Sequence, residues 1–487
     1  MVATGNQSMR RYLTIISAAL VLVLGVGAPR PVSAKTYSLE ECLTLAKENR
    51  ASITKALGDK RNAKASVRRQ FGRLILPNIS GSYRLSESRE RDQTSEALVD
   101  PNPPIFDSVL TNGGRWLPIA FDTSDVTEVV TTDVPDQDRS SKSLSVQASL
   151  TLFDGLSNIH DYLGVKKASE AADFDLERAK QNLELTVKAA YFTYLANVRN
   201  LAVQEEAVKR SEEQLNLVQS KYDVGSASLS DVLKQKVQFG NDNLTLLEAQ
   251  QGVITSKSDL AFSVGLDPSD NDDFDTTYTE RGYTGEVDGA IETALASHPG
   301  LKSSDLNFQM QKQFLKSAYG DYLPRVTASA SRSWSTSSRP DNLDRSLDFK
   351  GTSTSFGITI SMNIFDQMVR EQNVVRNSVA RNNARADLQE ARNNVVLETQ
   401  KAYYEVEKAT EQVKVSEENV ASATEDMNLA REKYNLGSAS ILDLLDAQVS
   451  LKQAQVSLIR AQLDLNVAVA RLDNAMGVST QGAGADN

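Results

Sequence analysis

One short stretch occurs twice in this chain, and the duplication constrains the fold more than any other feature. The later copy starts at Tyr434 and reads Tyr-Asn-Leu-Gly-Ser-Ala-Ser-Ile-Leu-Asp; the earlier one starts at Tyr222, 212 positions before it, and reads Tyr-Asp-Val-Gly-Ser-Ala-Ser-Leu-Ser-Asp. In each copy a long helical pattern ends at a glycine, Gly225 or Gly437, and another helical pattern begins. Glycine suits this reversal because it adopts the left-handed conformation at little cost. Taken alone, the stretch is a helical hairpin turn, so its surroundings must decide whether it is more.

A serine three positions before an aspartate follows each turn. The pairs are Ser228 with Asp231 and Ser440 with Asp443. This spacing is typical of a capping box, and an acid in the first turn also suits the positive end of the helix dipole. Each turn therefore predicts the start of a return helix.

The duplication covers the chain after residue 34 and divides it into two structural repeats. We place the first at residues 35–267 and the second at 286–479, with a linker at 268–285 and a tail at 480–487. Each repeat is expected to contain a helix, a β-hairpin and a long helical hairpin. Since both repeats follow one plan, neither is expected to be complete alone.

Residues 1–34 have the pattern of a secretory signal peptide. Arg10 and Arg11 precede an apolar run at 12–27, and small residues follow at 32–34. The run is short for a membrane span, although a retained anchor helix is the alternative. The rest of the chain has no apolar run long enough to predict a transmembrane helix.

Composition narrows the class of function. After residue 34 the chain has 50 Lys and Arg against 64 Asp and Glu, a net charge of -14, which argues against nucleic acid as a partner. A single cysteine, Cys42, and two histidines, His160 and His298, predict neither a disulfide framework nor a metal site. No nucleophile with a base can be assembled either, so we expect no cofactor and no enzyme activity.

The repeats open with helices. A capping box at Ser38 predicts one helix that ends near Ile75. Its counterpart is expected from about Asp288 to Tyr322, with an early break or kink at Pro299.

After each of these helices the hydrophobic period changes to two, which predicts strands. The apolar positions are Ile79, Gly81, Tyr83 and Leu85, then Leu144, Val146, Ala148, Leu150 and Leu152, then Val326, Ala328, Ala330 and Trp334, and last Phe356, Ile358, Ile360, Met362 and Ile364. One apolar face and one face of small polar residues suit a transmembrane β-barrel. A soluble sandwich with one buried face uses the same alternation and is the alternative.

The number of strands decides how a barrel could form. Four strands in two distant hairpins are few for a sandwich and too few to close a barrel, so a barrel must combine several chains. The first hairpin contains an insert at about 88–142 with eleven acids and five bases, and the second has a much shorter connection at 336–351. Long loops on one side of the sheet fit the outer face of an outer-membrane barrel.

Very long helical patterns follow the second strands. Phe153-Asp154-Gly155 and Phe365-Asp366-Gln367 each open one. The first pattern runs to Tyr222 and the second from about Met368 to Tyr434, and 67 residues of helix are about 100 Å long. The return helices, 228–264 and 440–476, are shorter. We therefore expect the first helix of each repeat to stand end to end with its return helix, and long helices of this kind need partners.

These features together resemble the TolC-type outer membrane factors. The resemblance rests on Leu-Pro before the strands, Phe-Asp after them, and Tyr-x-x-Gly-x-x-x-x-x-Asp at both helix turns. It implies an α+β membrane protein whose homotrimer joins four strands per chain into a twelve-stranded barrel in the outer membrane lipid of a Gram-negative bacterium, above an α-helical periplasmic tunnel. It also implies a periplasmic adaptor and an inner-membrane pump of RND, ABC or MFS type, for efflux or type I secretion.

The resemblance also assigns roles to residues at the turns. Asp443 and Asp446 match the carboxylates that ring the closed periplasmic entrance, although capping or surface acids are the alternative. Lys234 occupies the place of Asp446 in the first repeat. We also expect the turn residues to contact the adaptor; they are Gly225, Ser226, Gly437 and Ser438.

A latch between neighbouring coiled coils is implied as well. Tyr434 and Asp231 match the hydrogen-bonding pair that holds the entrance shut, and Ser230 is a third latch position. The chain departs from the pattern at Ala439, where an arginine would provide one more bond. The alternative from another class is a trimeric adhesin, whose strands would be contiguous at the C-terminus.

Overall fold

The computed structural model describes residues 36–90, 93–99, 128–134, 137–269, 272–277, 282–338 and 349–478. The predicted signal peptide, the tail and much of the acidic insert lie outside these residues. The chain forms two compact units that each combine distant segments. Unit 1 is Met1–Val67, Gly164–Lys312 and Ser378–Asn487, and unit 2 is Arg68–Leu163 and Gln313–Asn377. The two repeats follow each other along the chain, whereas each compact unit combines segments of both repeats.

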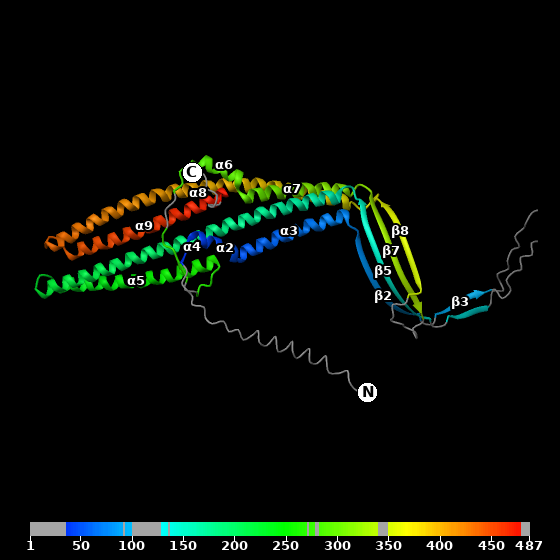
Figure 1. The fold of residues 1–487 in the computed structure, drawn as a ribbon, viewed down its shortest axis with the longest axis horizontal. Coiled ribbons are helices and arrows are strands. Elements are labelled where there is room, and N and C mark those ends of the chain that lie inside the picture. Colours follow the sequence, from blue (N-terminus) through cyan, green and yellow to red (C-terminus); the bar gives the residue numbers. More distant parts are fainter. Residues whose placement is uncertain are drawn as a thin grey trace, which may run out of the picture. The chain divides into compact units, whose positions relative to one another are not determined.

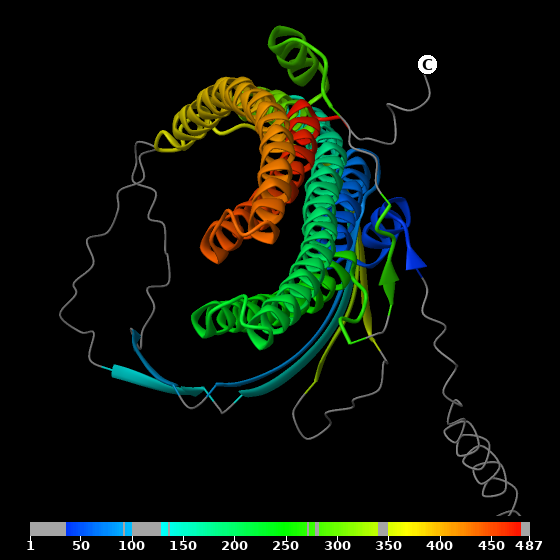
Figure 2. The ribbon, with the colours of Figure 1, turned by 90° about the vertical axis from the view of Figure 1, so that its left-hand side faces the viewer.

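Two long helical hairpins dominate unit 1. The outward helices, α4 and α8, have 67 residues each, and the return helices, α5 and α9, have 36 each. Figures 1 and 2 show the hairpins side by side, with both turns at the same end of the unit. The predicted lengths are confirmed by the bounds α4 Ser157–Asp223, α5 Leu229–Val264, α8 Val369–Asn435 and α9 Ile441–Met476.

The opening helix of each repeat is broken in two. The first repeat has α2 (Leu39–Asn49) and α3 (Ala51–Ile75), and the second has α6 (Val287–Ser297) and α7 (Pro299–Gly320). The break at Pro299 is confirmed, but the prediction of one unbroken helix to Ile75 is wrong. Arg50 is extended, its Nη1 donates to the Phe262 carbonyl at 2.8 Å, and its guanidinium lies 4.8 Å from the Phe262 ring.

The return helices end beside these breaks: Gly265 lies against Asn49 and Arg50, and Gly477 against His298. This confirms that the opening helix of each repeat stands end to end with the return helix. At the end of α9, Ser297 Oγ donates to the Met476 carbonyl at 2.6 Å. Gly477 has φ of 70°, and a Cβ there would lie 2.6 Å from the Cα of His298. The terminal glycine is therefore required both by the backbone conformation and by the close approach of the next chain segment.

Residues 273–275 of the linker between the repeats pack onto the helices of unit 1. Within it, β6 (Asp273–Phe274) pairs in parallel with β1 (Thr36–Tyr37). The Phe274 side chain is only 3% exposed, and its ring lies 5.7 Å from that of Tyr194. Tyr191 Oη donates to the carbonyl of Asp275 at 2.5 Å. The start of the first repeat and the linker thus share one core.

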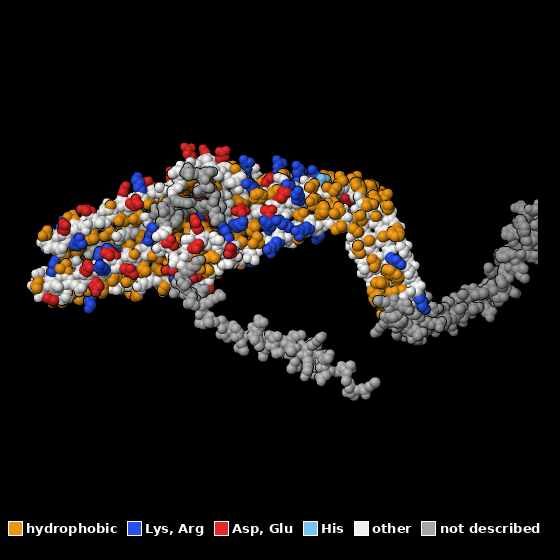
Figure 3. Space-filling model, in the orientation of Figure 1, with side chains coloured by type: hydrophobic (Ala, Val, Ile, Leu, Met, Phe, Trp, Pro, Cys, Tyr) orange, Lys and Arg blue, Asp and Glu red, His pale blue; other side chains and the backbone are white. Residues whose placement is uncertain are grey.

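Unit 2 contains a four-stranded antiparallel sheet in the order β2-β5-β7-β8. One face of this sheet is apolar: Ala148 pairs with Ile79 and Ala330, and Ala330 pairs with Phe356. These side chains are not covered, since Ile79 is 68% and Phe356 82% exposed, and Figure 3 shows hydrophobic side chains along the strands. The strands are β2 Asn78–Glu90, β5 Gln137–Phe153, β7 Arg325–Ser338 and β8 Gly351–Ser361.

The other face of the sheet is lined by small hydroxyl side chains. Ser82 Oγ lies 2.8 Å from Ser145 Oγ, and Ser331 Oγ lies 2.7 Å from Ser355 Oγ. The predicted alternation is confirmed, except that β8 ends at Ser361 and does not include Met362 and Ile364. The Ile364 carbonyl accepts a hydrogen bond from Arg370 and so belongs to the turn into α8.

The described residues hold more strands than the four predicted. Within the acidic insert, β3 (Gln93–Val99) and β4 (Glu128–Val134) form a separate antiparallel pair. Together with β1 and β6 they bring the described strands to eight, in three sheets. None of the described helices has an apolar stretch long enough to cross a bilayer.

Candidate functional site

The two turns of the helical hairpins have the same backbone. Gly225 and Gly437 have φ of 75° and 76°. After each glycine, a serine amide reaches back to a carbonyl of the preceding helix: Ser226 to Lys221 at 2.7 Å, and Ser438 to Lys433 at 2.9 Å. No atom lies within 4 Å of a Cβ placed on either glycine. The glycines are therefore required by the left-handed conformation and not by crowding.

Both return helices begin with a complete capping box, as predicted. In α5, the Asp231 carboxylate accepts from the backbone amide of Ser228 at 3.1 Å and from its hydroxyl at 2.8 Å. In α9, the Asp443 carboxylate accepts the same two bonds from Ser440 at 2.8 and 2.9 Å. The predicted latch acid and one predicted gate acid thus cap their helices within a single chain.

Asp443 and Asp446 both lie exposed at the start of α9. Hydrogen bonds from the backbone and then the side chain of Ser440 lower the pKa of Asp443, and the charge of Lys433 acts in the same direction. Asp443 therefore caps its own helix, which is the alternative to a gate role given above. Asp446 lies outside the capping box, so a gate role for either acid stays a prediction.

Tyr434 is held inside the tip of the second hairpin. Its side chain is only 9% exposed, and it packs in a cluster with Leu444, which is fully buried. The Lys221 ammonium lies 4.4 Å from the centre of the Tyr434 ring. Burial and then the charge of Asp231 raise the pKa of Tyr434. No hydrogen bond joins Tyr434 to Asp231 within the described chain, so the latch stays a prediction.

Ser230, the third latch position, lines a groove between α5 and α9. The groove has a volume of about 580 Å³ and is mostly apolar. Leu229 and Leu233 are each more than half exposed there. The other lining residues are Lys234, Val237, Gln238, Leu442 and Leu445. The turns thus stand beside an open hydrophobic surface.

An ion pair that the sequence did not indicate joins the two hairpins. Lys452 Nζ on α9 lies 2.7 Å from a carboxylate oxygen of Asp242 on α5, and the Asp242 side chain is only 5% exposed. Gln238 Nε2 donates to the same carboxylate at 3.1 Å. The seven-residue spacing of Gln235, Asp242 and Ala249 was visible in the sequence, but only the structure shows that all three are buried.

Among the described residues, no group of three or more His, Cys, Asp or Glu side chains is placed to hold a metal ion. Cys42 is a free thiol with no exposed surface, and burial, with a smaller effect of Glu41, raises its pKa to about 12. A thiol in this state is a poor nucleophile near neutral pH.

Comparison with known proteins adds to this geometry. Residues 42–266 and 290–478 match the family described as outer membrane efflux protein. A curated relative, the outer membrane efflux protein BepC of Brucella suis, is 23% identical over 227 residues. That match covers 47% of this chain and spans about half, 48%, of the relative's length.

Solved structures share the fold at low sequence identity. A membrane protein from Pseudomonas aeruginosa has a TM-score of 0.71 at 16% identity, over 91% of this chain and 90% of its own. The CmeC outer membrane channel of Campylobacter jejuni has a TM-score of 0.70 at 16% identity, over 90% and 85%. The MtrE outer membrane channel of Neisseria gonorrhoeae, solved in an open state, has a TM-score of 0.67 at 16% identity, over 90% and 89%.

The family match thus confirms the resemblance drawn from the sequence. The family match includes parts of both repeats and both helix turns. The chain therefore belongs to the outer membrane efflux protein family.

Proposed function

We propose that this protein is a passive exit channel for efflux or type I secretion, with its sheet in the outer membrane and its long helices in the periplasm. It moves substrate only when a partner pump provides energy, and it performs no chemistry on that substrate. The observation that carries the proposal is the four-stranded sheet with one exposed apolar face and one hydroxyl-lined face. Such a sheet suits contact with lipid on one side and water on the other.

The edges of the sheet support a trimer. Among the described residues, β2 and β8 each pair with another strand on one side only. Four strands are too few to close a barrel, and an unpaired edge is a template for another chain. Three copies would give twelve strands, and edge-to-edge pairing between copies would remove every free edge of the main sheet.

The helical hairpins support a tunnel and a docking site. An isolated helix as long as α4 or α8 needs partners along its length, and neighbouring copies would provide them. We assign the turns at Gly225, Ser226, Gly437 and Ser438 to contact with a periplasmic adaptor, beside the apolar groove at Leu229 and Leu233. An inner-membrane pump of RND, ABC or MFS type completes the proposed system.

We assign the gate to Asp443 and Asp446. In a trimer they would form a set of six carboxylates that attracts cations and resists closure unless it is neutralised. The supporting observations are that both acids are exposed and that Asp443 is held in its ionised form by Ser440. Tyr434, Asp231 and Ser230 would form the latch, which is supported by the effect of Asp231 on the pKa of Tyr434.

The experiment is conductance through the purified protein in a planar bilayer, with a trivalent cation added from the periplasmic side. We expect a small conductance and block by the cation. Asp443→Asn with Asp446→Asn should weaken the block by about tenfold or more, because each trimer loses six charges at the entrance. Asparagine keeps an oxygen that can accept the Ser440 bonds, so the fold of the tip is preserved.

Asp259→Asn is the control for loss of an acid away from the entrance, because Asp259 is exposed on α5 near its other end. It should leave the block unchanged. Unchanged block in the double variant would remove Asp443 and Asp446 from the gate. Tyr434→Phe should raise the fraction of time that the channel is open; no rise would eliminate the proposed latch.

A further inference from the structure

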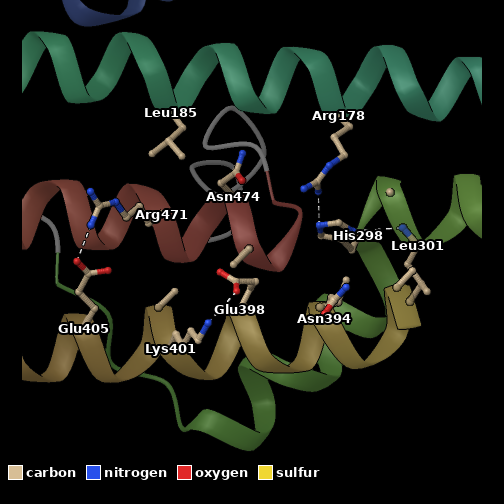
Figure 4. A pocket seen from close by; sticks show the side chains of 15 residues that line it. Arg178, Leu185, His298, Leu301, Asn394, Glu398, Lys401, Glu405, Arg471 and Asn474 are labelled. Atoms are coloured by element: carbon tan, nitrogen blue, oxygen red, sulfur yellow. Dashed lines mark hydrogen bonds and ion pairs between the residues drawn. The ribbon is translucent and has the colours of Figure 1, made fainter. Parts of the chain in front are cut away.

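A cavity in unit 1 lies where α7 begins and α9 ends, between α4 and α8. Its volume is about 560 Å³, within the usual range for small-molecule sites. Figure 4 shows charged and amide side chains around it from α4, α8 and α9, with His298 just before α7. The charged and polar residues that line it are Arg178, His298, Asn394, Glu398, Lys401, Glu405, Arg471 and Asn474.

The charges of this cavity do not balance. Glu398 is paired with Lys401 at 3.2 Å, and Glu405 is paired with Arg471 at 2.5 Å. These are both of the carboxylates that line the cavity, and each already has its cation. Arg178, the remaining cation, has no carboxylate partner among the described residues.

His298 cannot compensate the charge of Arg178. The imidazole is 7% exposed, and burial followed by the Arg178 charge lowers its pKa to about 4, so the ring is neutral at pH 7. One ring nitrogen, Nε2, faces the Arg178 guanidinium, and the other, Nδ1, faces the backbone amide of Leu301 at 3.3 Å. A neutral imidazole has only one acceptor nitrogen for these two donors, so one donor is left without a good partner in either tautomer.

The surroundings of Arg178 favour negative charge in two further ways. The first turn of α7, a helix of 22 residues, lines the cavity through Gly300 and Leu301, and a helix N-terminus carries partial positive charge. Asn394 and Asn474 add side-chain amides, which can donate to oxygen. Burial also lowers the pKa of Arg178 itself, which shows that its charged form is partly desolvated. A desolvated cation of this kind normally has a counter-ion.

We propose that this cavity binds a small oxyanion, a carboxylate or phosphate group held mainly by the Arg178 guanidinium. The planar guanidinium matches two oxygens of such a group. The site is formed within one chain and is separate from the gate at the helix turns. It therefore stands or falls independently of the proposed transport function.

The test is isothermal titration calorimetry of the purified full chain with inorganic phosphate, at constant ionic strength maintained with chloride. We expect saturable binding to the wild-type protein. Arg178→Gln should weaken it at least tenfold, because the guanidinium makes the main contact. The matched control is Lys180→Gln on the same helix, which removes one positive charge that is paired with Glu177 at 3.2 Å and does not line the cavity. It should bind phosphate within about twofold of the wild type.

A second variant and a second anion make the result decisive. Arg178→Lys retains the charge but not the planar fork, so it should bind more weakly than the wild type and more tightly than Arg178→Gln. Titration with acetate separates a carboxylate site from a phosphate site. The proposal is overturned if neither anion binds the wild type saturably, or if Lys180→Gln weakens binding as much as Arg178→Gln. Circular dichroism of each variant checks that the helices remain folded.

Discussion

The return helices α5 and α9 have the same length and the same ends, but different side chains pack along their middles. Both have 36 residues, both begin with a serine capping box, and both end at a left-handed glycine. At one position of the seven-residue repeat, α9 has only alanine, whereas α5 has one alanine and three polar residues. The series are Ala447, Ala454, Ala461 and Ala468 in α9 and Gln235, Asp242, Ala249 and Ser256 in α5.

This difference separates two kinds of constraint. The ends are dictated by backbone requirements that every helix has: unpaired amides at the start and a left-handed residue at the finish. The middles are set by whichever partner lies opposite. In α5, Asp242 faces Lys452 of α9, whereas its counterpart in α9 is Ala454. Duplicated segments therefore keep their caps while their packing diverges.

The largest expected effect comes from burial at the first position of each return helix. Ile441 in α9 is 3% exposed, and its counterpart in α5, Leu229, is 53% exposed. Ile441→Ala should destabilise the tip by about 2 to 4 kcal/mol and Leu229→Ala by less than about 1 kcal/mol. Hydrogen exchange of the tip amides measures both. Equal losses would contradict the difference in burial seen within one chain.

The ion pair between the helices gives the next effect. Asp242→Ala introduces alanine, the residue that the second repeat has at the matching position, Ala454. It leaves Lys452 without its ion-pair partner. Because the Lys452 side chain is 20% exposed and can reach water, we expect a loss of about 1 to 3 kcal/mol, below the range for a fully buried pair. Adding Lys452→Met should recover most of it in a double-mutant cycle measured by urea unfolding. Additive losses would show that the pair does not couple the hairpins.

The caps should behave alike, in contrast to the middles. Ser228→Ala and Ser440→Ala each remove one hydroxyl from a capping box of the same geometry. Each should weaken the first turn of its helix by about 1 kcal/mol, again by hydrogen exchange. If one variant lost twice as much as the other, the proposed equivalence of the two helix ends would be wrong.

The smallest effect concerns the pKa of Asp443. Hydrogen bonds from Ser440 lower it, so their contribution to stability is present above the ordinary carboxyl range and is lost as the pH falls through the lowered pKa. Ser440→Ala removes the hydroxyl bond but keeps the backbone bond. The pKa should therefore rise only part of the way to its usual value, as followed by NMR of ¹³C-labelled aspartate. Ser228→Ala is the control and should leave the pKa of Asp443 unmoved.

Several elements were predictable because their signals are local. The turns at Gly225 and Gly437, the serine caps and the alternation in the strands each depend on residues a few positions apart. The two long helices could be delimited to within about two residues, because Phe-Asp precedes each of them and a Tyr-x-x-Gly turn follows. Local conformational preference and one-sided burial were sufficient for these elements.

Other features depend on partners that are distant in the sequence. No proline marks the break at Arg50. The extended Arg50 is held instead by a hydrogen bond from its guanidinium to the carbonyl of Phe262, 212 positions away. The end of β8 before Met362 depends on the carbonyl of Ile364 meeting Arg370 on the next helix. The pairing of β3 with β4 was missed because the composition of the insert resembles that of a loop.

The candidate site shows the same division. The sequence located the turns and the acids Asp231, Asp443 and Asp446 through their spacing. It did not indicate that Tyr434 is buried while Tyr222, its counterpart, is 38% exposed, or that Asp242 joins the hairpins.

The sequence by itself determined the duplication, the kind and order of the main elements, and the capped helix ends, because these follow from the backbone needs and hydrophobic period of short segments. Only the tertiary structure decided which copy of each duplicated residue is buried, which charges find partners, and that Arg178 faces a cavity without a carboxylate. Burial and pairing are properties of two segments at once, and two similar segments acquire different roles when their neighbours differ.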